Sequence, residues 1–140
     1  MPTYTTSLKL ESSGDGDIHD LTGDLRGAVA DSGIRSGTAT AFVPGSTAGI
    51  TTIEFEPGLV RDTAQALERL APRDIDYGHN RGGETNGHAH IRASLIGPGV
   101  TVPLVDGHLT LGTWQQIVLI DCDDRPRRRE VVLQIVGDAG

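Results

Sequence analysis

The chain has 140 residues, one cysteine and a net charge of −7 from 19 acidic and 12 basic residues. This length suits one domain with a single core, and no apolar run reaches the 18 or so residues that a membrane span needs. The acidic balance disfavours nucleic acid, because phosphate backbones bind positively charged surfaces. We therefore predict a single domain over residues 1–140 with neither a membrane nor a nucleic acid as partner.

The lone cysteine and the N-terminal residues indicate a cytoplasmic location. Cys122 has no partner for an intrachain disulfide, which fits a reducing compartment. The first residues lack the basic-then-apolar order of a signal peptide. Asp121 and Asp123 flank Cys122 and disfavour its thiolate, so a nucleophilic role is not expected.

The basic residues are of an unusual kind. Eleven of the twelve are arginine, and Lys9 is the only lysine. Abundant aspartate, scarce lysine and many small residues are typical of a surface adapted to high salt. A halophilic protein is therefore one interpretation, and an ordinary acidic cytosolic protein is the other.

The first half of the chain contains strand and helix patterns in alternation. Residues 3–10 alternate between apolar and polar and predict a strand. Asp17 is the expected N-cap of a helix that Gly33 ends. Strands are predicted over residues 36–43 and 46–55, separated by Pro44 and Gly45, and a helix follows over residues 59–70, with Pro57 at its start.

The second half begins with a polar stretch, residues 77–97, which holds three of the five histidines between a tight turn and a predicted helix. Asp106 and Gly107 are a strong hairpin signal. The remaining expected strands cover residues 100–105, 108–111, 114–120 and 127–136.

These elements predict an α+β fold with a mainly antiparallel sheet, about seven strands and about three helices covering one face. Aromatic residues make up only 4% of the chain, so the core is aliphatic and thin for this length. A sheet with such a core is expected to complete itself by forming an oligomer.

Residues 45–62, 77–80, 86–121 and 125–137 closely resemble the YjbQ family of uncharacterised proteins. The most specific segments are Asn-x-x-x-His-x-x-x-Ser-x-x-Gly, which starts at Asn86, and Leu-Gly-Thr-Trp-Gln, which ends at Gln115. The resemblance implies a YjbQ-like α+β fold assembled as a homotrimer, with polar clefts between subunits. Some members are described as secondary thiamine-phosphate synthases, which join a pyrimidine pyrophosphate to a thiazole phosphate.

The chain departs from the family pattern at two places. Many members carry His-Thr-Thr-Ala where this chain has Gly-Ser-Thr-Ala, so the family histidine falls on Gly45. An Asn-Glu pair of the family becomes Ile53-Glu54. Archaeal-looking members share the Gly-Ser-Thr version, which indicates a subgroup trait.

His79 and His90 are the main candidates for chemistry, as an acid–base pair or as metal ligands, because a loop and a helix start can converge on one site. His88 lies about 200° around the helix from His90 and is expected to face elsewhere. Glu54 could act as a general base or complete a two-histidine, one-carboxylate site for Zn²⁺ or a similar divalent ion. Inert interface histidines and a water-facing glutamate are the alternatives.

Several other residues are predicted to bind substrate. Ser46 and Thr47 follow a strand and have free backbone, which suits phosphate binding through N–H groups. Asn86 shares the expected helix face of His90, and Trp114 with Gln115 could stack on or bind a pyrimidine. The full predicted set is Ser46, Thr47, Asn86, Trp114, Gln115 and Arg127.

Two of these assignments have a structural alternative. Trp114 could serve only packing. Arg127 and Arg129 share a strand face and could bind phosphate groups, or they could pair with the aspartates of residues 121–124 across the hairpin. Asp123 and Asp124 are a weak candidate for a Mg²⁺ site.

Two functions follow. One is a transferase-like enzyme acting on small phosphorylated heterocycles between the subunits of a homotrimer. The other is a non-catalytic trimer that binds a metal ion or a small anion.

Overall fold

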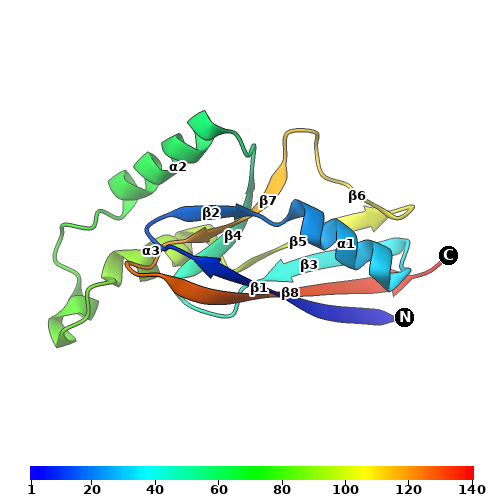
Figure 1. Cartoon of the computed structure of the whole chain (residues 1–140), viewed down its shortest axis with the longest axis horizontal. Coiled ribbons are helices and arrows are strands. Elements are labelled where there is room, and N and C mark those ends of the chain that lie inside the picture. The colour runs from blue at the N-terminus through cyan, green and yellow to red at the C-terminus, as the bar shows by residue number, and fades with distance from the viewer.

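The computed structural model describes residues 1–140, with eight strands, three α-helices and one short 3-10 helix (Figure 1). In chain order the elements are β1 (Thr3–Ser12), β2 (Asp17–Asp20), α1 (Thr22–Ser32), β3 (Ser36–Phe42), β4 (Ala48–Ile53), α2 (Pro57–Leu70), η1 (Gly78–Gly82), α3 (Gly87–Ile96), β5 (Gly99–Val105), β6 (His108–Leu109), β7 (Gln116–Asp121) and β8 (Arg127–Asp138). No helix is long and apolar enough to cross a membrane.

The strands form two antiparallel sheets instead of the one that we expected. The larger has the order β1-β8-β3-β5-β6, and the smaller has the order β2-β7-β4. β1 and β8 pair over their length, from Thr3 opposite Val136 to Ser12 opposite Arg127. These paired strands, which begin and end the chain, run side by side in Figure 1. The antiparallel α+β fold class is confirmed.

The core lies on both faces of β7. Ile117 and Leu119 belong to a cluster of 17 buried residues that includes Leu25 of α1. Val118 and Ile120, which point to the other face, pack in a second cluster that also contains Leu67 of α2, Ala89 of α3 and Cys122. One face of β7 therefore packs against the larger sheet and α1, and the other packs against α2 and α3. The helices do not all lie on one face, so the expectation that they cover one face is wrong.

Cys122 is buried because it packs in the second cluster, with Leu67 of α2 and Ala89 of α3. Burial raises the pKa of its thiol to about 11. This agrees with the prediction that Cys122 is no nucleophile.

The predicted start of the first helix at Asp17 is also wrong. Residues 17–20 form β2, whose partners in β7 are residues 118–121. α1 begins only at Thr22, whose N–H donates to Asp20 Oδ1 at 2.9 Å. A pairing with a strand a hundred residues away overrides the local helix pattern. The helix does end at Gly33, whose φ of 69° is left-handed.

The start of β7 differs from expectation too. Trp114 and Gln115 precede the strand, which begins at Gln116. The indole of Trp114 is 72% exposed, so within this chain it does not serve core packing.

Candidate functional site

His79 and His90 come together as predicted. His79 lies in η1 and His90 in the first turns of α3, and their ring centroids are 4.5 Å apart with an interplanar angle of 59°. His79 is exposed and His90 is half-buried. Two imidazoles at this distance can serve one bound group, as the sequence pattern indicated.

Asn86 connects this histidine pair to a buried carboxylate. Asn86 Nδ2 donates to Asp123 Oδ1 at 3.3 Å, which turns Asn86 Oδ1 towards His79 Nε2 at 3.2 Å. Because an amide oxygen only accepts, His79 carries its proton on Nε2 in this arrangement. The second ring nitrogen, Nδ1, is then left to accept a proton.

The side chain of Asp123 is fully buried and binds groups from four segments. It accepts hydrogen bonds from Arg127 Nε at 2.7 Å, Thr47 Oγ1 at 3.0 Å and the N–H of Asp124 at 2.8 Å, besides Asn86. Burial by itself would raise the pKa of Asp123, but these hydrogen bonds outweigh it and hold the pKa well below its usual range. Asp123 is therefore ionised at neutral pH, and this buried carboxylate is the hub that orients the site.

Arg129 and Asp121 form a second buried pair beside this hub. Arg129 Nε donates to Asp121 Oδ2 at 2.7 Å, and Arg129 Nη2 donates to Asp121 Oδ1 at 2.8 Å and to Thr47 Oγ1 at 2.7 Å. The hydrogen bonds to Asp121 raise the pKa of Arg129. Thr47 thus joins both aspartate–arginine pairs.

The alternative that pairs Arg127 with an aspartate is the one that the structure adopts. Arg127 binds Asp123 across the β7–β8 connection. Arg127 and Arg129 therefore neutralise buried carboxylates, and only part of their positive charge remains for a ligand.

One nitrogen of Arg129 stays unbonded. Its Nη1 makes no hydrogen bond within the chain and lies near Gly45, where an added Cβ would come within 3.2 Å of it. The backbone N–H groups of Gly45, Ser46 and Thr47 donate no hydrogen bond within the chain either. Consecutive free N–H groups beside a guanidinium are the donors that an oxyanion requires.

This loop borders a cavity that also reaches a histidine. The cavity has a volume of about 260 Å³ and is lined by residues of the β3–β4 connection and of α3: Gly45, Ser46, Ala48, His90, Ala93, Ser94 and Pro98. Ser46 and His90 therefore share one cavity, while Thr47 and Asn86 do not line it and are bound to Asp123.

Three predicted site residues lie elsewhere in the chain. Glu54 and Trp114 line a different cavity of about 460 Å³. Gln115 Nε2 donates to Thr52 Oγ1 at 3.2 Å. His90 lies beside the start of β4, whereas Glu54 follows its end, about 20 Å away at the usual rise of roughly 3.3 Å per residue. Within one subunit, Glu54 does not join the histidines.

The predicted metal site has two ligands in one chain. No group of three His, Cys, Asp or Glu side chains is arranged to hold a metal ion. Zinc sites use at least three protein ligands, so the third would have to come from another subunit. His88 does not belong to this site. It is fully buried in α3, and neither ring nitrogen has a hydrogen-bond partner.

The central residues of the network, Asp121 and Arg129, were not among the predicted site residues. The sequence pattern does indicate this network. Carboxylates follow one predicted strand, and arginines begin the next predicted strand after a short turn. The sequence indicated the pairing only as one of two alternatives.

A family model described as "UPF0047 protein YjbQ-like" matches residues 6–138. The chain belongs to this family. A UPF0047 protein of Methanothermobacter thermautotrophicus is 37% identical over 98% of this chain and 94% of its own length. The YugU protein of Bacillus subtilis, also UPF0047, is 29% identical over 94% of this chain and 98% of its own.

Solved structures of the YjbQ type share the fold. A YbjQ-like protein of unknown function from Sulfolobus solfataricus has a TM-score of 0.94 at 29% identity and covers 98% of this chain and 99% of its own. A YjbQ/UPF0047 protein of Clostridium acetobutylicum has a TM-score of 0.85 at 37% identity, over 94% of this chain and 99% of its own. The family assignment made from the sequence motifs is confirmed.

Proposed function

We propose that this YjbQ-family chain binds a small phosphorylated substrate in the cavity beside Gly45, and that it works as a transferase in a homotrimer. The observation that carries the proposal is the set of unbonded donors at one place: the N–H groups of residues 45–47 and Nη1 of Arg129, next to His90.

These donors favour an oxyanion over a cation. A phosphate accepts several N–H bonds at once, and a guanidinium nitrogen strengthens them by its charge. Arg129 is held by Asp121 and Thr47, so its free nitrogen keeps its position without a ligand. Preorganised donors of this kind stabilise charge that develops on an oxygen during a reaction.

The histidines supply the acid–base groups. His90 lines the cavity, and the ring of His79 stacks on it at a tilt. With Nε2–H of His79 directed to Asn86, Nδ1 is free to accept a proton from a substrate or a water. Asp123 holds Asn86 in the orientation that sets this tautomer.

The weak thiamine-phosphate synthase-like reaction is the specific form of this proposal. The C–O bond between the pyrimidine methylene and its pyrophosphate breaks, and the pyrophosphate leaves with the electron pair. The thiazole nitrogen then bonds to the methylene carbon. Arg127 and Arg129 already neutralise Asp123 and Asp121. A bound Mg²⁺ would therefore have to supply the remaining charge for a leaving pyrophosphate.

The homotrimer explains why the predicted site residues form two groups. Glu54 and Trp114 are separated from His79 and His90 within the chain, and a neighbouring subunit can bring the second group to the first. Large apolar side chains that are exposed in one chain suit such contacts: Phe42, Phe55, Leu70, Ile75, Ile91, Leu95, Val105 and Trp114.

Mixed trimers test this arrangement. His90→Ala and Glu54→Gln subunits are each assayed alone and after co-refolding, with formation of thiamine phosphate as the readout. We expect each variant alone to form intact trimers that lose most turnover, and the mixture to regain a fraction, because some interfaces then carry both wild-type residues. Full turnover in His79→Ala and His90→Ala trimers would exclude the catalytic role.

The second candidate is a non-catalytic trimer that binds a metal ion or a small anion. The observation in its favour is the 4.5 Å approach of the His79 and His90 rings, which suits two ligands of one divalent ion such as Zn²⁺. Metal analysis of untagged protein purified without chelators distinguishes a metal site at the two histidines from the oxyanion site beside Gly45. About one ion per subunit, lost in His79→Ala and in His90→Ala, supports a metal site. Saturable phosphate binding in metal-free protein supports the oxyanion site.

A further inference from the structure

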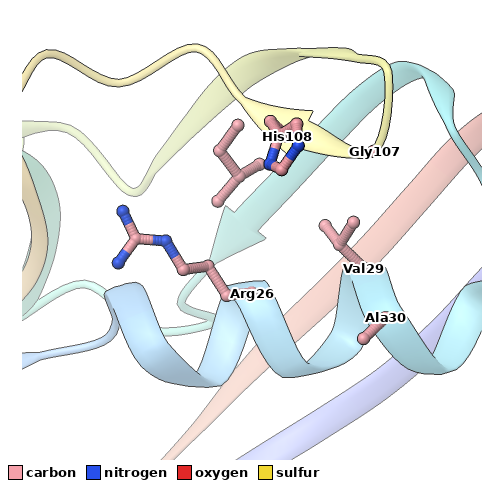
Figure 2. Close-up of a pocket in the computed structure, with 6 residues that line it drawn as sticks. Arg26, Val29, Ala30, Gly107 and His108 are labelled. Carbon is pink, nitrogen blue, oxygen red and sulfur yellow. The ribbon is translucent and has the colours of Figure 1, made fainter.

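A second cavity lies between α1 and the β5–β6 hairpin, away from the histidine pair and its network. Its volume is about 280 Å³, and it is lined by Arg26, Val29 and Ala30 of the helix and by Gly107, His108 and Leu109 of the hairpin. Arg26 and Val29 extend from the helix towards the hairpin that carries His108 (Figure 2). None of these residues belongs to the oxyanion cavity beside Gly45.

Arg26 is the one charged side chain that lines this cavity, and no carboxylate of the chain pairs with it. Neither Arg26 nor His108 makes a side-chain hydrogen bond or an ion pair, although the chain carries 19 acidic residues. Arg35 donates only to the backbone oxygen of Asp106. A guanidinium and an imidazole that line one cavity without partners in the chain can both donate hydrogen bonds to an anion.

The hairpin that forms one wall is held in place. Asp106 and Gly107 both have positive φ, of 51° and 80°, as a tight two-residue turn requires. The N–H of Gly107 donates to Arg35 O at 2.8 Å, and Arg35 Nη2 donates to Asp106 O at 2.9 Å. A Cβ on Gly107 would come within 3.0 Å of the Arg35 guanidinium. The wall is therefore preformed, which lowers the entropic cost of binding.

The remaining lining residues are apolar, which limits the kind of anion. Val29, Ala30 and Leu109 can contact a short hydrocarbon but offer no side-chain hydrogen bond. The volume equals that of roughly nine water molecules at about 30 Å³ each. An occupant of this size has one charged group and a few carbon atoms.

We propose that this cavity binds a small monocarboxylate, with its carboxylate held by both Arg26 and His108 and its carbon chain on Val29 and Leu109. The planar guanidinium of Arg26 can donate two parallel hydrogen bonds to the two oxygens of a carboxylate. Small anions without a planar pair of oxygens fit this geometry less well. The cavity shares no residue with the cavity beside Gly45, although Arg26 also borders the cavity of Glu54 and Trp114.

Butyrate is the probe, and butyramide is its neutral isostere. Amide resonances of Gly107 and Leu109 and ring resonances of His108 are followed by NMR during titration. We expect saturable shifts with butyrate, and an affinity about tenfold lower in Arg26→Gln and in His108→Gln. Arg61→Gln is the matched control, since Arg61 is exposed on α2 and has no ion pair; it should leave the affinity unchanged.

Two results would overturn the proposal. Equal binding of butyramide and butyrate would show that the cavity recognises only the hydrocarbon. Shifts that stay linear with concentration, or that persist unchanged in both Arg26→Gln and His108→Gln, would show that no carboxylate site exists there. Phosphate binding beside Gly45 should be unchanged in His108→Gln, because His108 lines only the cavity between α1 and the hairpin, and this separates the two sites.

Discussion

Arg129 holds Asp121 with two parallel hydrogen bonds, from Nε at 2.7 Å and from Nη2 at 2.8 Å, and both side chains are buried. This geometry needs the planar fork of a guanidinium, and a lysine ammonium cannot reproduce it. The pair therefore links β7 to β8 and directs Nη1 of Arg129 towards Gly45.

Arg129→Lys should lower the free energy of unfolding by about 3–5 kcal/mol, because it leaves Asp121 buried without its full set of donors. Urea unfolding at pH 7 measures this. Arg128→Lys is the control: Arg128 makes only an exposed pair with Glu11, so a change within about 0.5 kcal/mol is expected. Equal effects of the two substitutions would contradict the structural role of Arg129.

Asp123 should make the protein sensitive to acid. Its pKa is lowered in the folded state, so its contribution to stability is present above the unfolded value of about 3.9 and is lost as the pH falls through the folded pKa. Asp123→Asn should cost about 3–5 kcal/mol at pH 7, with a difference from wild type that shrinks below about pH 4. The exposed Asp138→Asn should change neither quantity. A pH-independent difference would refute the linkage.

His88 should destabilise the fold at mildly acidic pH. Burial, helped by the nearby charges of Arg92 and Arg73, lowers the pKa of His88, so the unfolded chain takes up the proton first. Stability is then lost as the pH falls below about 6.5. His88→Leu removes two buried nitrogens that lack partners, and should stabilise by about 1–2 kcal/mol at pH 7 and by more at pH 5. A destabilised His88→Leu would mean that the ring has a partner such as a buried water.

Gly45→Ala should weaken phosphate binding. The new Cβ would crowd Arg129 Nη1, and the φ of 142° at this position favours glycine. We expect at least a tenfold loss of affinity by calorimetry with inorganic phosphate, together with about 1 kcal/mol of lost stability. Gly82→Ala has open space and ordinary φ, so it should retain the affinity. Unchanged binding in Gly45→Ala would remove Arg129 Nη1 from the proposed site.

The acidic surface predicts salt dependence. Self-repulsion at a net charge of −7 falls as salt screens it, and a salt-adapted surface gains further at molar concentration. The unfolding midpoint should rise by about 5 °C or more between 0.1 and 2 M KCl, since about 1 kcal/mol shifts it by several degrees in a chain of this size. A midpoint that stays flat above 0.2 M KCl would favour the ordinary acidic protein.

Local chemistry was enough to predict several elements. The alternation of residues 3–10 predicts β1, because one face of that strand is packed and the other is not. Gly33 ends α1, and Asp106 with Gly107 makes the hairpin, since these residues tolerate positive φ. His79 and His90 were also identified together, because both lie in one short polar stretch whose turn and helix bring them close.

Contacts between distant segments decided the rest. The residues around Asp17 have a helical pattern, yet Asp17 lies in β2 opposite Asp121 of β7. Backbone hydrogen bonds between these two strands outweigh a weak local helix propensity. Residue type alone made Glu54 a candidate partner of the histidines. The length of β4 places Glu54 at the opposite end of that strand from His90.

The sequence by itself determined the family, the antiparallel α+β class and the histidine pair, since these depend on short-range patterns and on motifs. Only the tertiary structure decided that Arg127 and Arg129 bind Asp123 and Asp121, and that one nitrogen remains free beside Gly45. The physical reason is that burial makes an unpaired charge costly, so the choice among partners is made by the packing of β7 against β8 and its surroundings.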